Sequence, residues 1–140
     1  MNTWGECGGE PGQFALPHRV GIDRRDMVYV VDRNNDRIQI FTPEGELAGV
    51  WTDFLWPQDL HLDPREELAY VVETQASGSK IPRLSIRDMK GDTVCSWTGA
   101  GENGRKVLDN CHSVCVDSRG DVYVGEVMRT RRIQKFVRVR

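Results

Sequence analysis

Three positions that could carry chemistry recur along the chain at the same distance before an aspartate. His18 lies five residues before Asp23, and His112 lies five residues before Asp117; Gln58 occupies the third such position. Imidazoles bind metal ions and titrate near neutral pH, so His18 and His112 are candidate ligands for Zn²⁺ or Ca²⁺. The alternative is that each histidine hydrogen-bonds a neighbouring backbone carbonyl and only stabilises its strand.

Acidic residues also recur, each three residues after a tyrosine. They are Asp32, Glu73 and Glu126. Carboxylates at equivalent positions could bind a cation or a cationic ligand, or act as general bases. They could instead pair with arginines such as Arg33, Arg37 or Arg132. Recurrence in all three copies favours the structural role, because catalysis needs only one copy.

These residues belong to a sequence repeat. Each copy has an alternating run that ends in aspartate, a core of Val or Ala followed by Tyr-Val, and a run that begins with arginine. A tryptophan precedes each copy, at spacings of 47 and 46 residues (Trp4, Trp51 and Trp97). Repeats of this length made of four short strands are typical of β-propeller blades. We therefore predict an all-β fold in a single domain, 1–140, with repeats at about 5–51, 52–97 and 98–140.

Alternation of apolar and polar residues, interrupted by turn-forming residues, predicts the strands. They are expected at 18–22, 27–31, 37–41 and 47–51, then at 58–63, 68–73, 83–88 and 93–97, and finally at 112–117, 121–126 and 132–139. The third repeat thus has one strand fewer than the others. The loop at 74–82 is longer than its counterpart in the first repeat, and long loops on a rigid scaffold often determine binding specificity.

Three blades cannot close a ring, and open sheet edges tend to pair with other chains. Residues 1–4 stand where the outermost strand of a preceding blade would end. We therefore expect a homodimer whose two copies together form a six-bladed propeller. The N-terminal strand of one copy would then complete the last blade of the other.

The repeats resemble NHL repeats and the six-bladed NHL propellers of bacteria. Residues 9–41 carry the signature G-x-P-G-Q-F-x-x-P-H-x-V-x-[IV]-D, followed by V-Y-V-x-D-x-x-N-x-R-I-Q-x-F. The third repeat matches almost as well, and the second departs most, with Gln58 in place of histidine. This resemblance implies a propeller fold. It does not imply one function, because the family includes ligand-binding, protein-binding, RNA-binding and catalytic members.

One branch of this resemblance implies a specific chemistry. The peptidyl-hydroxyglycine amidating lyases are six-bladed propellers that hold a metal in the central channel through histidines of the innermost strands. The segments around His18 and His112 are similar to those ligand positions. A metal-dependent lyase or hydrolase is therefore an alternative function. The catalytic tyrosine or arginine of such an enzyme is not identifiable here, since the three tyrosines all occupy blade-core positions. The sequence therefore favours a protein that is not an enzyme and leaves the question open.

The starts of the innermost strands and the loops between second and third strands should gather on one side of the ring. The candidate ligand-binding residues on that side are His18, Arg19, Arg33, Gln58, Asp59, Glu73, His112, Ser113 and Glu126. Mixed charge and amides suit a polar ligand. We expect a scaffold that binds a small polar molecule or a protein partner there, with only solvated turns on the opposite side. A fragment that serves assembly alone is the third possibility.

Composition narrows the partners further. The chain has 19 Lys and Arg against 21 Asp and Glu, for a net charge of −2, so no basic face is expected to bind nucleic acid. No apolar run is long enough to span a membrane, and residues 1–14 lack the features of a secretory signal. A cytoplasmic protein is expected, and a secreted or periplasmic protein whose signal has been removed is the alternative. Its four cysteines form no CxxC pair and should be reduced thiols, with Cys111 and Cys115 on one face of their strand.

Overall fold

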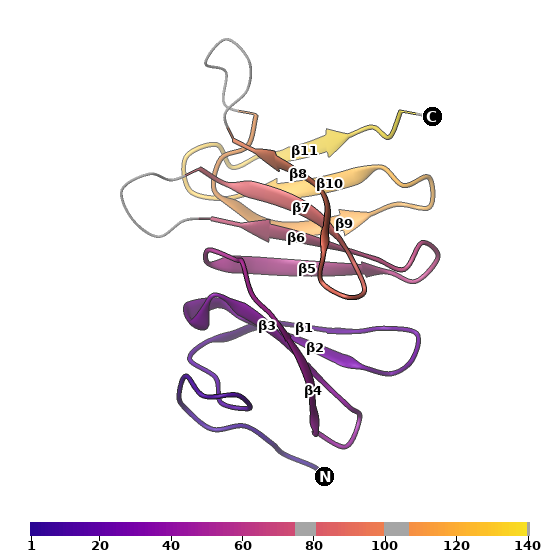
Figure 1. Cartoon of the computed structure of the whole chain (residues 1–140). Coiled ribbons are helices and arrows are strands. Elements are labelled where there is room, and N and C mark those ends of the chain that lie inside the picture. Colours follow the sequence, from indigo (N-terminus) through magenta and orange to yellow (C-terminus); the bar gives the residue numbers. More distant parts are fainter. Residues whose placement is uncertain (75–80, 100–106, 140) are drawn as a thin grey trace.

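Three antiparallel sheets make up the structure, a computed structural model that describes residues 1–74, 81–99 and 107–139 (Figure 1). Each sheet matches one of the expected repeats to within one residue, and we call the sheets blades 1, 2 and 3. Blade 1 contains β1 (Pro17–Ile22), β2 (Val28–Asp32), β3 (Arg37–Phe41) and β4 (Leu47–Trp51). Blade 2 contains β5 (Pro57–Asp63), β6 (Leu68–Glu73), β7 (Arg83–Asp88) and β8 (Thr93–Thr98). Blade 3 contains β9 (Cys111–Val116), β10 (Val122–Glu126) and β11 (Ile133–Phe136). The prediction of an all-β fold made of propeller blades is confirmed.

The aspartate at the end of each innermost strand, or directly after it, also closes the hairpin that follows. One carboxylate oxygen of Asp23 accepts hydrogen bonds from the backbone N–H groups of Arg25 and Met27, at 2.8 and 3.0 Å. Asp117 bonds Arg119 and Asp121 in the same way. Such turns are a common use of aspartate, whose short side chain reaches the backbone two residues ahead. This explains why the aspartate recurs at a fixed distance from the histidine positions.

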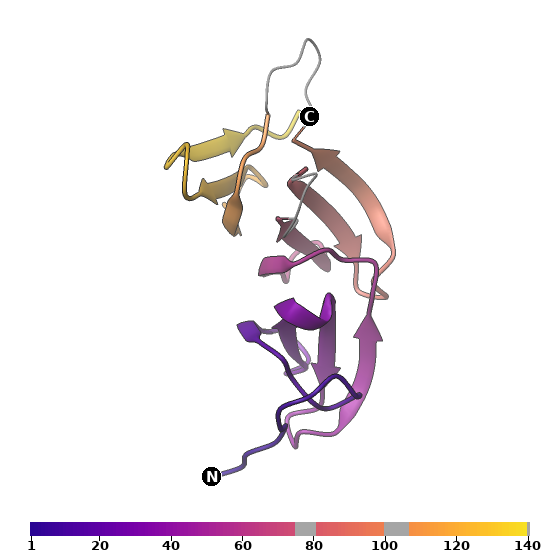
Figure 2. The same ribbon diagram turned by 90° about the vertical axis from the view of Figure 1, so that its left-hand side faces the viewer.

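The blades stack face to face along an arc, with β4 and β8 on its outer side (Figure 2). We call the side of a blade that packs on the next blade its trailing face, and the side that packs on the preceding blade its leading face. The first core cluster joins trailing residues of blade 1, such as Tyr29 and Ile38, to leading residues of blade 2, such as Leu60. The second joins Tyr70 and Leu84 of blade 2 to blade 3 residues that include Val114, Val122 and Val124. Apolar burial between blades is therefore the main force that holds the stack together.

A tryptophan at the end of one repeat packs against a turn of the next blade. Trp51 lies over the β7–β8 turn, where a Cβ built on Gly91 would be only 2.6 Å from the indole. Gly91 also has φ +95°, a conformation that L side chains rarely adopt. Trp4 lies over Gly45 in the β3–β4 turn in the same manner. Only glycine fits at these two turns, and the Trp–Gly contact repeats with the blades.

The strand bounds differ little from those expected, except that β11 ends at Phe136 rather than at Val139. Within the described part of the chain, no helix is long and apolar enough to cross a membrane.

Candidate functional site

A β-bulge lies at the start of each innermost strand. The pairing of β1 with β2 shifts between Pro17 and Arg19, and that of β5 with β6 shifts between Pro57 and Asp59. The pairing of β9 with β10 shifts at the corresponding place, around His112. His18, Gln58 and His112 thus occupy equivalent bulges, each without a partner in the ladder. Bulges redirect side chains and are frequent beside functional sites.

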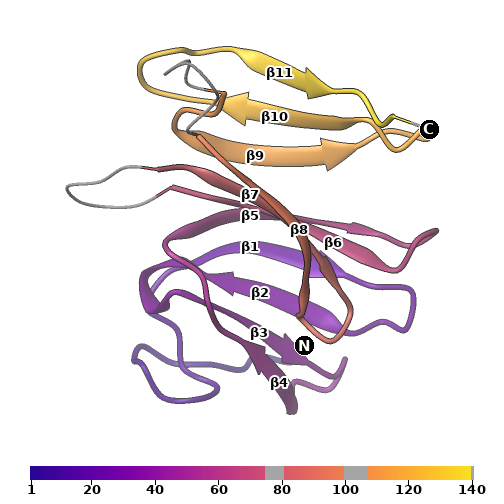
Figure 3. The same ribbon diagram turned by 45° about the horizontal axis from the view of Figure 1, so that its top comes forward.

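Because β5 lies between β1 and β9 (Figure 3), the bulges of blades 1 and 3 bring the two histidines together. The rings of His18 and His112 meet edge to face, with centroids 5.4 Å apart. Nδ1 of His18 lies 2.6 Å from the carbonyl oxygen of Gln58. Since a carbonyl oxygen only accepts hydrogen bonds, Nδ1 carries a proton, and Nε2 is the ring nitrogen that has the lone pair in the neutral form of the ring. His18 therefore makes the hydrogen bond to a neighbouring backbone carbonyl that a purely structural role predicts. Its other ring nitrogen can still serve as a metal ligand.

Two imidazoles are fewer donors than a metal centre needs. Zn²⁺ sites in proteins have three or four protein ligands, and Ca²⁺ prefers six or more oxygens. Among residues 1–74, 81–99 and 107–139, no group of three or more His, Cys, Asp or Glu side chains could hold a metal ion. The described residues of a single copy therefore do not fit a complete metal site, and metal binding by His18 and His112 stays a prediction.

Asp59, a predicted ligand-binding residue, joins all three blades. One of its carboxylate oxygens lies 3.1 Å from Nε of Arg19 in blade 1, and the other accepts a 2.9 Å hydrogen bond from the backbone N–H of Val114 in blade 3. Arg19 also donates to the carbonyl of Leu60, at 3.4 Å. Asp59 and Arg19 thus connect neighbouring innermost strands, although the Arg19 side chain stays half exposed.

A hollow of about 430 Å³ opens beside the bulges, and we call it the Arg33 hollow. Arg33 begins the short 3₁₀ helix η1 (Arg33–Asn35), and its guanidinium carbon lies 4.4 Å from the centre of the Trp56 ring. Its Nε is buried and has no hydrogen-bond partner among the residues that the structure describes. The lining residues come from all three blades and their links: Arg33, Trp56, Gln58, Thr74, Asn110, Cys111, His112, Val127, Met128 and Arg129. None of these described lining residues is a carboxylate, so the hollow has a cationic character.

Trp56 was not identified from the sequence. Its backbone has φ +50°. The backbone N–H of Trp56 donates a 2.7 Å hydrogen bond to the carboxylate of Asp36, the residue that follows η1. A left-handed aromatic residue is uncommon and costs conformational energy, which a surrounding structure must balance. It lies directly before an innermost strand, as Leu16 and Asn110 do in the other repeats, but no shared residue type at this place marks it as part of the site.

The recurring carboxylates are buried and already paired, as the structural alternative proposed. Asp32 binds Arg37 at 3.0 Å, Glu73 binds Arg83 at 2.7 Å, and Glu126 binds Arg132 at 2.7 Å. Each carboxylate also accepts a backbone N–H from the link before the innermost strand, namely from Ala15 and Leu16, from Leu55 and from Asp109. We call this arrangement the carboxylate clamp. Glu73 and Glu126, expected to bind ligand, therefore hold the link in place and do not line the Arg33 hollow.

Burial and hydrogen bonding shift the pKa values of Glu73 and Glu126 in opposite directions. Burial raises the pKa of Glu73 above its ordinary value, and the hydrogen bonds from Arg83 oppose this only in part. Burial also raises the pKa of Glu126, but the hydrogen bonds from Arg132, Asp109, Thr130 and Gln134 outweigh it and lower that pKa overall.

The remaining predicted residues are placed as follows. Ser113 is exposed and packs its hydroxyl over Gly125, where an added Cβ would lie 2.3 Å from it. The loop at 75–80 lies outside the described residues. The expectation that Cys111 and Cys115 share one face is wrong, because the bulge at His112 shifts the alternation. Cys111 is buried in the core toward blade 2, whereas Cys115 is exposed.

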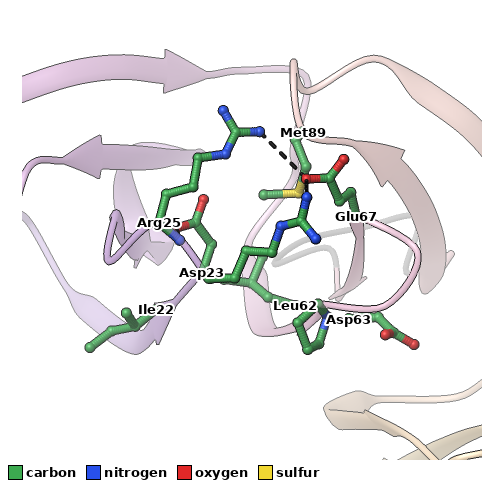
Figure 4. Close-up of a pocket in the computed structure, with 9 residues that line it drawn as sticks. Ile22, Asp23, Arg25, Leu62, Asp63, Glu67 and Met89 are labelled. Atoms are coloured by element: carbon green, nitrogen blue, oxygen red, sulfur yellow. Dashed lines mark hydrogen bonds and ion pairs between the residues drawn. The ribbon is translucent and has the colours of Figure 1, made fainter.

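The opposite side of the blades is also hollowed, although only solvated turns were expected there. A hollow of about 100 Å³ lies between the first turns of blades 1 and 2 (Figure 4). Ile22, Leu62 and Met89 contribute apolar surface, and Glu67 pairs with Arg24 and Arg25 at 2.6 and 3.7 Å. The aspartates at its edge serve the turns, so this hollow is less suited to a polar ligand than the Arg33 hollow.

Comparison with known sequences supports the interpretation of the repeats. No protein-family model matches the chain. NHL repeat-containing protein 3 of Homo sapiens and that of Mus musculus are each 31% identical over 144 residues, which cover 98% of this chain. The chain spans 40% of the length of these curated relatives. Both relatives are mammalian, so they give no support to the bacterial origin that the resemblance had implied.

Two solved structures share the fold at low sequence identity. A protein of unknown function from Bacteroides caccae aligns with a TM-score of 0.59 at 12% identity, covering 83% of this chain and 40% of that one. A putative oxidoreductase (glucose dehydrogenase) from Thermus thermophilus aligns with a TM-score of 0.56 at 19% identity, covering 81% and 37%. With the repeat signature, the carboxylate clamps and the NHL-named relatives, these findings show that the chain is built of NHL repeats folded as β-propeller blades.

Proposed function

We propose that this propeller scaffold binds a small anionic molecule, or an anionic group of a protein partner, in the Arg33 hollow. The observation that carries the proposal is the lining of the hollow. Arg33 and Arg129 contribute positive charge, and the described part of the chain places no carboxylate in the lining and no hydrogen-bond partner at the buried Nε of Arg33. A buried donor that lacks an acceptor is costly, and a ligand oxygen would remove that cost.

The other lining residues suit the same class of ligand. Guanidinium groups bind carboxylates and phosphates through paired N–H donors. The Trp56 ring holds the Arg33 guanidinium in place through a cation–π contact and offers a flat apolar wall. The amides of Gln58 and Asn110 can donate or accept. The volume, about 430 Å³, lies in the range of small-molecule sites, about 300–1,000 Å³.

Titration with citrate and, separately, with inorganic phosphate tests this function. Binding would be followed by calorimetry and by the ¹⁵N resonance of Arg33 Nε. We expect saturable binding of at least one anion, a shift of the Arg33 resonance, and an affinity lowered by about tenfold in Arg33→Gln, because a charge-assisted hydrogen bond is lost. Arg25→Gln, on the opposite side, is the matched control and should bind normally. Absence of saturable binding, or equal affinity in Arg33→Gln, would contradict the proposal.

A metal-dependent lyase or hydrolase is the second candidate function. Its support is the contact between the His18 and His112 rings, together with the bond from His18 Nδ1 to the Gln58 carbonyl. Metal-binding histidines commonly donate their other ring N–H to such a carbonyl, which orients the ring. Two donors per copy are too few, so this function requires further ligands from outside the described residues of one chain.

A further inference from the structure

The trailing face of blade 3 exposes a residue whose equivalents are buried inside the stack. Ile133 follows Arg132, just as Ile38 follows Arg37 in blade 1 and Leu84 follows Arg83 in blade 2. Ile38 is 0% exposed and Leu84 is 1% exposed, but Ile133 is 73% exposed. Burial of a side chain of this size stabilises a protein by removing apolar surface from water. The trailing face of blade 3 therefore has the form of an interface without its partner.

The leading face of blade 1 is open in the complementary way. Val20 is equivalent to Leu60 in blade 2 and Val114 in blade 3, each two residues after the bulge position. Leu60 is 1% exposed and Val114 is 6% exposed, whereas Val20 is 53% exposed. The outer half of this face is already covered, since the rings of Trp4 and Phe14 pack on Phe41 at 6.1 and 5.8 Å. Only the inner half, at Val20 and Ile22, is left open.

We propose that a second copy of this chain covers both open faces. The trailing face of blade 3 in one copy would pack on the leading face of blade 1 in the other, and a twofold axis would repeat the contact to close a ring of six blades. The chain itself carries both halves of the interface, in the register that blades 1, 2 and 3 already use with one another. This continuity selects another copy over an unrelated partner. Six blades lie within the normal range for propellers, about four to eight, and twofold symmetry is the commonest in oligomers.

The same equivalence fixes the strand register at the seam. Trp51 pairs with Ile38, and Trp97 pairs with Leu84. Trp4 already occupies the place of such a tryptophan, over Gly45, but residues 1–6 form no strand. Among the described residues, β11 pairs only with β10. Trp4 of one copy would therefore lie opposite Ile133 of the second copy, and the N-terminal residues would extend the third sheet to four strands.

Sedimentation of the full chain at micromolar concentration tests the assembly. We expect a mass of twice 15.9 kDa, or 31.8 kDa, and a mass of 15.9 kDa for Ile133→Asp, whose charge would be buried in the ring. Leu55→Asp, at an exposed leucine between blades 1 and 2, is the control and should stay dimeric. A monomeric natural chain would overturn the proposal and indicate that the open faces serve another occupant, such as further blades of a longer chain. A dimer that persists in Ile133→Asp would overturn it too.

Thiol labelling gives a second readout that does not depend on mass. Cys115 pairs with Tyr123 across β9 and β10, on the trailing face, and is exposed in a single copy. Labelling of Cys115 should be slower by about tenfold in the natural chain than in Ile133→Asp, because the interface must open first. Cys95, on β8 of blade 2, should react equally in both. Equal labelling of Cys115 in the two proteins would overturn the proposed seam.

Discussion

The Glu126 carboxylate accepts a 2.7 Å hydrogen bond from Nε of Arg132, and the buried acid and the half-exposed arginine together fix the link before β9. Asp32 with Arg37 and Glu73 with Arg83 repeat this relationship in the other blades. Three copies of one arrangement indicate that the clamp belongs to the architecture of the repeat. The chemistry specific to this chain lies instead where the repeats differ, at Arg33, at Trp56 and at the side chains that occupy the bulges.

Glu126→Gln should lower the free energy of unfolding at neutral pH by about 2 kcal/mol, because it removes a charge-assisted pair from a buried site. It should also change the pH dependence. The pKa of Glu126 is lowered in the folded state, so its stabilisation is fully present above the unfolded pKa of about 4.3 and is lost as the pH falls through the folded pKa. Urea unfolding at several pH values should show a shallower acid decline in the variant.

The control for this experiment is Glu44→Gln, at an exposed acid in the β3–β4 turn, which should leave both the stability and the acid decline unchanged. An acid decline of equal steepness in Glu126→Gln and the natural chain would show that Glu126 does not contribute to it.

Gly91→Ala should destabilise the chain by about 3 kcal/mol, since the added methyl would meet the Trp51 indole and φ is +95°. Gly12→Ala separates the two effects. Gly12 has φ +85°, but an added Cβ would meet nothing within 4 Å, so only the backbone strain of about 1 kcal/mol applies. Thermal or urea unfolding of both variants gives the comparison. Equal losses would mean that the Trp–Gly contact is unimportant.

The four cysteines should differ sharply in reactivity. Burial raises the pKa of Cys111 to about 12, so its thiol is almost fully protonated at about pH 8 and inaccessible as well. Iodoacetamide at this pH should spare Cys111 in the folded chain and label it after unfolding in urea, as peptide mass spectrometry would show. Cys7 and Cys95, which are exposed, provide the internal comparison. Rapid modification of Cys111 in the folded chain would contradict its burial against blade 2.

Zn²⁺ uptake should depend on assembly if the histidines bind metal. Each copy supplies two imidazoles, and the proposed ring supplies four, which matches a tetrahedral ion. We expect one Zn²⁺ per two chains by calorimetry and elemental analysis, with loss of binding in His18→Ala and in His112→Ala. His61→Ala is the control, because His61 packs its ring edge-on against Tyr70 in blade 2. Failure of the assembled protein to take up Zn²⁺ would leave these histidines a structural role.

The strands and blades could be predicted from sequence because each follows from local alternation and from the turn-forming residues between the strands. The contact between His18 and His112 could also be anticipated, since equivalent positions converge in a propeller. Whether Glu73 and Glu126 are free to bind a ligand could not be decided from sequence. Their hydrogen bonds depend on which backbone N–H groups of the links before β5 and β9 point toward them. Trp56 was missed for a similar reason: its place beside Arg33 depends on the left-handed conformations of Asp36 and Trp56 itself, and no local pattern reports them.

The contact of Trp51 with Gly91 means that the last residue of one sheet also packs on the outer turn of the following sheet. A tryptophan at the end of one sheet completes the following one, so a module that can be copied or removed runs from one tryptophan to the next. Deletion of residues 52–97 would join Trp51 directly to Thr98, leave Trp4 over Gly45, and put Trp51 where Trp97 now stands at the entry to the third blade. Duplication or deletion of such a module would therefore change the number of blades in whole steps and leave every remaining sheet intact.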